Sequence, residues 1–334
     1  MIGGHRLYGT GPPFGPTRSF VVEVGTMSGT SDVAVIDTGS AATSYRWSPA
    51  PLGRFYIRVK ARNEAGDGPP SQDVVVRSLD PRDFIEAIFL GSGPLRGEPP
   101  YCSGVMTGWP AGSEIRVLVS TSVPAVHRDV AMKTVAQFLE ATHGSVRGTV
   151  AIVDDPNPLP RKGEITIAAL DGPAMQAFCG RAAGCALTTL RGHEIRSARI
   201  AFLAFLSSAE RNVVAHELGH AVLGLCHMSV NGTSDLQPPA IMGNTSVKPN
   251  KQDDSWDPST VKASAAVYGA GLTPGAGWAE FFAAGLVNVP SSSSSFAAPS
   301  AGTPALPEGW IIRQQGDETI VIKPLCHKES PERR

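Results

Sequence analysis

Apolar and polar residues alternate along the first quarter of the chain, in the pattern of β-strands that bury one face. Short alternating runs that end in turn-forming residues predict strands. Such runs occur between residues 19 and 79 as SFVVEVGT, DVAVIDTG, TSYRWSP, GRFYIRVKARN and SQDVVVRSL. The pattern therefore predicts an all-β domain over residues 19–80, preceded by an irregular segment over residues 1–18.

From residue 82 onward, apolar residues follow both the helical and the strand period. Residues 114–120 (EIRVLVS) read as a strand, and residues 126–142 place apolar side chains at helical spacing. Further strand-like runs lie at residues 148–153, 164–169, 186–190 and 198–206, and the last leads directly into another helical segment. Helices and strands in this order predict an α+β domain over residues 82–271.

The helical segment after residue 206 contains the stretch HELGHAVLGLCH, residues 216–227. On a helix, positions four apart lie one turn apart on the same face. His216 and His220 can therefore both bind the same metal ion, each through a ring nitrogen at about 2.0–2.1 Å. Glu217 follows the first histidine and can reach a water on that ion without being a ligand itself. These residue types at this spacing indicate the chemistry of a zinc-dependent hydrolase.

The limits of this helix follow from the residues around the motif. Ser207 and Glu210 have the S-x-x-E spacing of a capping box, which predicts the helix start. Gly219 costs a helix about 1 kcal/mol relative to Ala, so its place beside the histidines indicates close packing. Gly224 is suited to the left-handed conformation that ends a helix, and we expect the helix to end there.

A third ligand depends on that helix end. In a continuous helix His227 would lie about 10 Å along the axis from His220, too far for one ion to bind both. A break at Gly224 lets the chain turn back and bring His227 to the metal. Cys226, the residue before it, is the alternative third ligand. We favour His227, and the sequence leaves the two assignments open.

The stretch resembles the long motif H-E-x-x-H-x-x-G-x-x-H of the metzincin zinc peptidases. It departs from that motif in one respect, because three residues rather than two separate His220 from the glycine. Met242, in QPPAIMGN, looks like the methionine of the tight turn that metzincins place beneath their zinc ligands. Residues 253–271 resemble the closing helix of matrixin-like catalytic domains. The resemblance implies a zincin fold, with a mixed twisted sheet beside an active-site helix.

This resemblance also implies an activity. One catalytic Zn²⁺ held by His216, His220 and His227 would keep an open position for water, and Glu217 would take a proton from that water as general base. Hydrolysis of peptide bonds in a protein or peptide substrate is then the expected reaction. The alternative is a catalytically inactive binding or adhesion protein on a degenerate metzincin fold, which the shifted glycine motivates. Whether structural Ca²⁺ binds is left open.

Part of the N-terminal β-region resembles a fibronectin type III domain. The run PLGRFYIRVKARNEAGDGPPS matches the later strands of such domains, with Tyr56, Val59, Ala61, Asn63 and Gly66 in the places that these domains favour. Nothing in the sequence corresponds to their first two strands. The resemblance therefore implies a partial, truncated sandwich over residues 19–80.

The composition of the chain indicates which kinds of molecule it is expected to bind. The net charge is −1, and no run of Lys and Arg interleaved with aromatic residues occurs, so nucleic acid is not expected as a partner. The longest apolar stretch, residues 200–206, is too short to span a membrane. Few charged residues and many Gly and Pro residues favour a loop-rich exported protein. We expect a monomer that acts on protein or peptide substrates.

Secretion is the localisation that this composition favours. The N-terminus lacks the charged start and apolar core of a signal peptide, so we expect that the chain begins inside a longer exported protein. Cys179 and Cys185 can close a short loop and Cys102 can pair with Cys326, which would leave Cys226 unpaired. Free, buried thiols are the other interpretation for two of these cysteines.

Beyond residue 271 the pattern weakens. Residues 291–295 are all serine and read as part of a linker. The strand-like runs WIIRQQ and TIVIKPL then flank a Gly-Asp turn. They predict a hairpin within a C-terminal extension over residues 272–334, to which the sequence assigns no function.

Overall fold

The computed structural model of the chain describes residues 15–45, 47, 53–78, 80–93, 95, 104–180, 183–205, 211–228, 242, 258–288, 311–315 and 318–322. The chain divides into two compact units, of which the first takes in the chain up to Asp80 and the second begins at Pro81. One unit is built on an antiparallel sheet, and the other combines a mixed sheet with helices. The finer domain limits expected from the sequence stay predictions.

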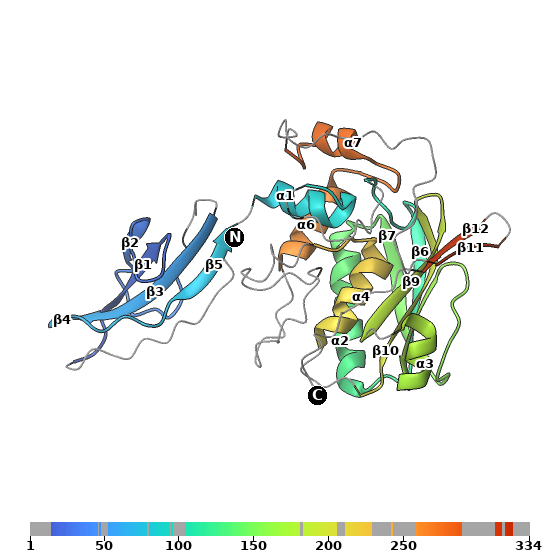
Figure 1. Ribbon diagram of the computed structural model, residues 1–334, viewed down its shortest axis with the longest axis horizontal. Coiled ribbons are helices and arrows are strands. Elements are labelled where there is room, and N and C mark those ends of the chain that lie inside the picture. The colour runs from blue at the N-terminus through green and yellow to red at the C-terminus, as the bar shows by residue number, and fades with distance from the viewer. Residues whose placement is uncertain are drawn as a thin grey trace. The chain divides into compact units, whose positions relative to one another are not determined.

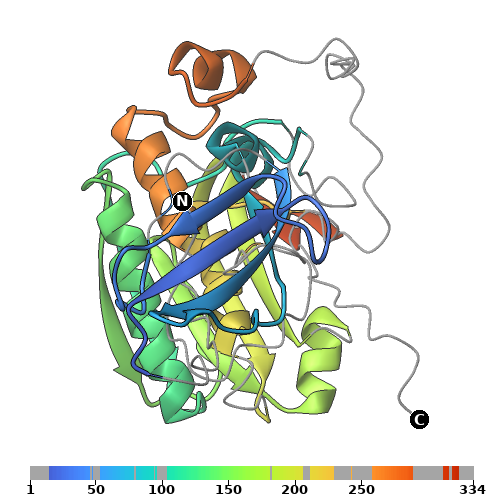
Figure 2. The ribbon, with the colours of Figure 1, turned by 90° about the vertical axis from the view of Figure 1, so that its left-hand side faces the viewer.

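The first unit is a single antiparallel sheet. Its strands are β1 (Ser19–Gly25), β2 (Ala34–Asp37), β3 (Gly53–Asn63), β4 (Gly66–Asp67) and β5 (Val74–Ser78). They follow the order β2-β1-β3-β4, and β5 also pairs with β3 (Figures 1 and 2, blue). The strand expected within residues 43–49 is absent from the part described there, residues 43–45 and 47.

The alternation in the sequence separates the two faces of this sheet. Val24, Phe55, Ile57 and Val76 form a buried apolar cluster, because every second residue of a strand points to the same face. On the other face Glu23 lies between two cations, with Arg58 Nε at 2.5 Å and Lys60 Nζ at 2.6 Å. The predicted all-β character of this region is thus confirmed.

The second unit contains the mixed sheet. Its strands are β6 (Ser113–Ser120), β7 (Val146–Val153), β8 (Glu164–Leu170), β9 (Gly184–Arg191), β10 (Glu194–Leu203), β11 (Ile311–Gln315) and β12 (Glu318–Ile322). They lie in the order β11-β12-β9-β10-β8-β6-β7. The pairs among β6, β7, β8 and β10 are parallel, whereas β9 pairs antiparallel with both of its neighbours. All the strands predicted between residues 114 and 206 are present.

The helices of this unit pack against the sheet or against one another. They are α1 (Pro81–Ile85), the π-helix η1 (Glu86–Leu90), α2 (Ala125–Ala141), α3 (Gly172–Cys179), α4 (Arg211–Leu223), α6 (Pro258–Gly269) and α7 (Trp278–Ala283). Helices α2 and α4 pack against each other, and α4 also packs against β9 and β10 (Figure 1). Every residue of β8 is buried, as expected for a central strand between two parallel neighbours.

Four of these helices were not expected from the sequence: α1, η1, α3 and α7. Helix α3 carried a readable signal, since Asp171 caps it by accepting a hydrogen bond from Ala174 N–H at 2.8 Å and a proline follows at the first turn. The disulfide between Cys179 and Cys185 then joins α3 to β9, which confirms the first of the two suggested pairings. Cys102 and Cys326 lie outside the described residues.

The C-terminal hairpin is present as predicted. Strands β11 and β12 pair from Ile311 with Ile322 to Gln315 with Glu318, and β12 adds to the sheet beside β9. Residues 187–190 of β9 are therefore paired with β10 on one side and with β12 on the other. Across the residues described, no helix is long and apolar enough to cross a membrane.

Candidate metal centre

Helix α4 carries the motif and is a core helix. Val214, Leu218, Ala221 and Val222 share one face of the helix and are fully buried, and Ala215, Leu223 and the motif residues on the other faces are buried as well. A helix that is buried on every side lies inside a protein, and α4 packs against α2 and against the sheet. The predicted capping residues, Ser207 and Glu210, lie outside the described residues.

The helix ends at Gly224, as predicted. This residue has a φ of 69°, in the left-handed region that glycine adopts without strain. Its N–H donates to the carbonyl of His220 at 3.1 Å, and the N–H of Leu225 donates to the carbonyl of Gly219 at 3.1 Å. A Cβ at position 224 would overlap the backbone carbonyl of Thr107. Glycine is therefore required twice, by conformation and by space.

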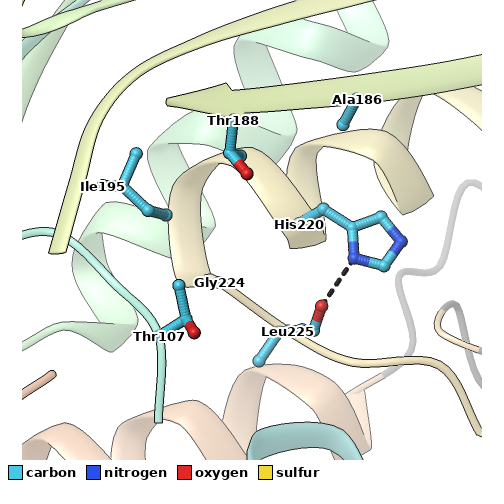
Figure 3. Close-up of a pocket in the computed structure, with 7 residues that line it drawn as sticks. All are labelled: Thr107, Ala186, Thr188, Ile195, His220, Gly224 and Leu225. Carbon is cyan, nitrogen blue, oxygen red and sulfur yellow. Dashed lines mark hydrogen bonds between the residues drawn. The ribbon is translucent and has the colours of Figure 1, made fainter. Parts of the chain in front are cut away.

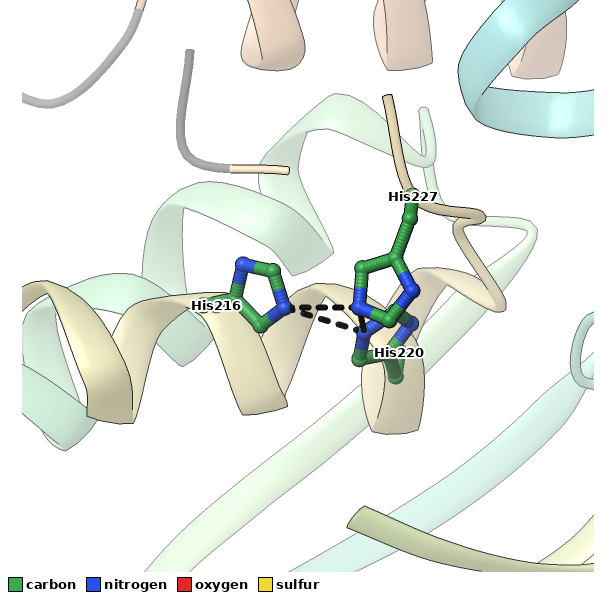
Figure 4. Close-up of side chains that lie close together, drawn as sticks. All are labelled: His216, His220 and His227. Atoms are coloured by element: carbon green, nitrogen blue, oxygen red, sulfur yellow. Dashed lines mark hydrogen bonds between the residues drawn. The ribbon is translucent and has the colours of Figure 1, made fainter. Parts of the chain in front are cut away.

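Backbone hydrogen bonds fix the chain after the helix end. Cys226 N–H donates to the carbonyl of Ile88 in η1 at 2.6 Å, and Met228 N–H donates to the carbonyl of Met242 at 2.8 Å. His227, between these two anchored residues, turns back toward α4. Its ring lies beside those of His216 and His220, as Figure 4 shows.

The three imidazoles converge on one point. Their Nε2 atoms lie 3.1 Å apart for His216 and His227, 3.2 Å for His216 and His220, and 3.1 Å for His220 and His227. Three nitrogens bound tetrahedrally at about 2.0–2.1 Å would be about 3.3 Å apart. The rings are buried, with exposed fractions of 8%, 7% and 3% for His216, His220 and His227. The spacing thus fits a single shared ion.

Hydrogen bonding among the rings alone does not account for this arrangement. His220 Nδ1 lies 2.5 Å from the carbonyl oxygen of Leu225, so Nδ1 carries the proton and Nε2 presents a lone pair (Figure 3). In a neutral ring, Nε2 either carries a proton or presents a lone pair, so at least two of the three Nε2 atoms must be alike. Those two atoms cannot form a hydrogen bond with each other. A cation that accepts all three lone pairs removes the conflict. Imidazole ligands suit zinc and several other transition ions.

The cluster also bears on the choice of third ligand. Among the residues described, His227 completes the group, and Cys226 does not belong to it. Cys226 is disulfide-bonded, and a sulfur in a disulfide is not a thiolate ligand. The expectation that Cys226 is the unpaired cysteine is wrong.

Glu217 lies on α4 directly after His216 and is almost fully buried. Its carboxylate accepts a hydrogen bond from the N–H of Ala186 on β9, while Oε2 has no hydrogen-bond partner among the described residues. Burial raises the pKa of Glu217 well above its usual value, and the Ala186 N–H opposes this shift. A buried carboxylate oxygen is therefore available beside the histidine that precedes it.

Gly184 makes room for this carboxylate. A Cβ at position 184 would overlap Val213 and would lie 2.9 Å from Glu217 Oε1. Neither Gly184 nor Ala186 stands out in the sequence as a residue of this site. A glycine at the start of a strand is a weak sign of such a close approach.

Met242 and Gly219 pack together. Met242 is fully buried, and a Cβ at position 219 would overlap its Sδ atom. This contact explains why the helix tolerates a glycine between its two histidines, as expected from the sequence. Met242 therefore lies against the ligand-bearing helix.

A small pocket opens next to His220. It is lined by Thr107, Ala186, Thr188, Ile195, His220, Gly224 and Leu225 (Figure 3). Two of these residues belong to β9 and two to the helix end, so the pocket joins the sheet to the metal centre. The nearby Trp109, which the sequence did not single out, donates its indole N–H to the carbonyl of Ala221 at 2.9 Å.

Comparisons of the chain with family models, with curated proteins and with solved structures gave no match. The likeness to metzincins and to fibronectin type III domains therefore rests on the motifs quoted above.

Replacing Gly224 should be more costly than replacing another left-handed glycine. Gly271 has a φ of 74° and open space around its Cβ position, so Gly271→Ala is the matched control. Each alanine costs about 1–2 kcal/mol for the left-handed conformation. The overlap with Thr107 should make Gly224→Ala about 1–3 kcal/mol worse still. Urea denaturation measures the difference, and equal losses would contradict the importance of the close approach.

The metal content of three variants tests the ligand set. His227→Ala should lose zinc at concentrations where the wild-type chain holds one ion, because two imidazoles no longer enclose the site. Cys226→Ser and His193→Ala should keep the ion, since neither residue belongs to the cluster. Mass spectrometry of the dialysed proteins gives the stoichiometry. Retention by His227→Ala together with loss by Cys226→Ser would reverse the assignment.

Proposed function

We propose that this chain is a zinc-dependent endopeptidase in which His216, His220 and His227 hold the ion and Glu217 is the general base. The observation that carries the proposal is the convergence of three buried Nε2 atoms at 3.1–3.2 Å beside a buried carboxylate. The residues fit the ion in type, spacing and burial. When bound, zinc lowers the pKa of a water molecule and polarises a carbonyl oxygen.

The surroundings of Glu217 suit proton transfer. The Ala186 N–H holds the carboxylate in place, and Oε2 is left without a hydrogen-bond partner among the described residues, so this oxygen can accept a proton. Burial also raises the pKa of this carboxyl, so once it has taken the proton it can hold that proton until it passes to the leaving amine. Gly184 and Val213 limit where the carboxylate can move.

A peptide substrate is favoured by the strand next to the site. Ala186 and Thr188 of β9 line the pocket beside His220, so an extended chain along β9 would pass close to the metal centre. Extended peptides bind such strands through backbone hydrogen bonds. The metzincin-like assignment is supported further by the helix end at Gly224 and by Met242 against Gly219.

The alternative function, a binding or adhesion protein without activity, was motivated by the extra residue before Gly224. The rings of His216, His220 and His227 converge in spite of this residue. The spacing is thus no reason to expect a lost metal, and the buried Glu217 has no evident role in a protein that only binds.

The remaining features support a secreted protein. Disulfides such as the one between Cys179 and Cys185 persist in oxidising compartments. The antiparallel sheet of the first unit is compatible with part of a fibronectin type III domain, an accessory module in this proposal. A monomer that acts on proteins or peptides, with one zinc ion, is the proposed working form.

Glu217→Gln tests the catalytic role. The amide keeps the size of the side chain but cannot take a proton, so cleavage of casein or of a peptide library should fall by about 10²–10⁴-fold. Zinc content should stay at the wild-type level, because Glu217 is not a ligand. Undiminished cleavage would refute the general-base role. If both proteins hold zinc and neither cleaves any peptide, the binding protein is the better account.

Gly184→Ala tests the positioning of Glu217 without altering a ligand or the carboxylate. The new methyl group would press on Glu217 Oε1 and Val213, so kcat should fall while zinc content is unchanged. Gly172→Ala, at a glycine with open space and an ordinary φ, is the matched control and should leave kcat unchanged. Equal kcat values for the two variants would show that the fit of Glu217 against β9 does not matter.

A further inference from the structure

Strand β9 is paired on both sides, and one partner comes from the far end of the chain. On one side it pairs with β10, from Glu194 with Arg191 to Phe202 with Gly184. On the other side it pairs with β12 of the C-terminal hairpin (Figure 1). The side of β9 that β10 leaves open is therefore occupied by a distant segment of the same chain.

This strand is also the one that contacts the metal centre. Ala186 donates its N–H to Glu217, and Ala186 and Thr188 line the pocket beside His220. An extended peptide that reaches this centre along the sheet needs the backbone groups of β9 that face away from β10. Those are the groups that β12 uses.

The pairing of β12 with β9 extends toward the metal centre and ends just before it. The pairs are Thr319 with Leu190, Ile320 with Thr189, Val321 with Thr188 and Ile322 with Leu187. The next residue of β9 is Ala186, which contacts Glu217. Strand β12 thus covers one half of the docking edge, antiparallel to β9, and ends one position before the residue that holds the carboxylate.

We propose that β12 is a displaceable resident strand on this edge of β9, which competes with any extended peptide that pairs with β9. The effect on catalysis rests on the proposed function, whereas the competition for β9 does not. The occupant is a segment of stated sequence, ETIVI, whose β-branched residues favour strands. It therefore shows the orientation and the register in which another chain would bind.

Strand β12 has an advantage over a free peptide because it belongs to the same chain as β9. Residues 289–310, rich in Ser, Ala and Pro, connect the hairpin to the rest of the unit. A segment tethered by a linker of this length competes at an effective concentration on the order of millimolar. A free peptide must exceed that competition, so the resident strand raises the KM of every peptide that uses β9 and leaves kcat unaffected.

The experiment weakens the resident strand in the full chain. Thr319→Pro/Val321→Pro removes two backbone N–H donors from β12, so the strand cannot keep its full ladder. Ser293→Pro/Ser295→Pro places the same two prolines outside the hairpin and is the matched control. The probe is a fluorescent peptide with the sequence of residues 311–322, measured by anisotropy on Glu217→Gln forms of all proteins so that no cleavage occurs.

The hairpin variant should bind this probe about tenfold more tightly than the control and the parent chain, since the tethered competitor is weakened. With Glu217 restored, the KM of a peptide substrate should fall by a similar factor at constant kcat. Equal binding by all three proteins would overturn the proposal. If the proline variant does not fold, a full-length chain in which residues 318–322 are replaced by a Gly-Ser run of equal length removes the occupant without adding proline, keeps Cys326 and is read in the same way.

The two proposals fail in different ways. Tighter probe binding without cleavage by any form would refute the endopeptidase and keep the docking edge. Cleavage with unchanged KM and unchanged probe binding would keep the endopeptidase and refute the resident strand.

Discussion

The end of helix α4 is the constraint on which the candidate metal centre depends. Gly224 adopts a left-handed conformation and lies so close to the Thr107 carbonyl that no side chain fits. The next residues are then fixed by the Cys226 N–H on Ile88, which leaves His227 facing α4. Convergence of the three histidines depends on where the chain places His227 after the turn, and less on the number of residues before Gly224. An additional helical residue before the glycine is for this reason compatible with a converged site.

Burying polar groups is costly unless they have partners, and this centre buries three imidazoles and a carboxylate together. The protein offsets part of the cost with the carbonyl of Leu225 for His220 and the N–H of Ala186 for Glu217. The three converging Nε2 atoms cannot all be satisfied by hydrogen bonds to one another, and a single shared cation would satisfy them. Strand β9 is also tied to α3 by the Cys179–Cys185 disulfide, next to the residues that contact Glu217. Sheet, disulfide and helix end thus support one small group of side chains.

Much of the second unit could be predicted from local patterns, since its central strands are short apolar runs and α2 has a clear helical period. The misses have physical causes. Helix α3 is brief and depends on the cap at Asp171. The π-helix η1 is a short, fully buried segment whose Ile88 carbonyl anchors Cys226, a contact across more than a hundred residues that no window of sequence contains. The pairing of β9 with β12 has the same character.

The sequence by itself determined the motif residues His216, Glu217 and His220, the helix that carries them and the glycine that ends it. Spacing on a helix and the conformational freedom of glycine are local properties. Only the tertiary structure decided that His227 rather than Cys226 joins the cluster, that Gly184 and Ala186 of β9 accommodate Glu217, and that β12 occupies the edge beside the centre. These outcomes depend on which distant segments meet, and contacts of that kind are set by the packing of the whole unit.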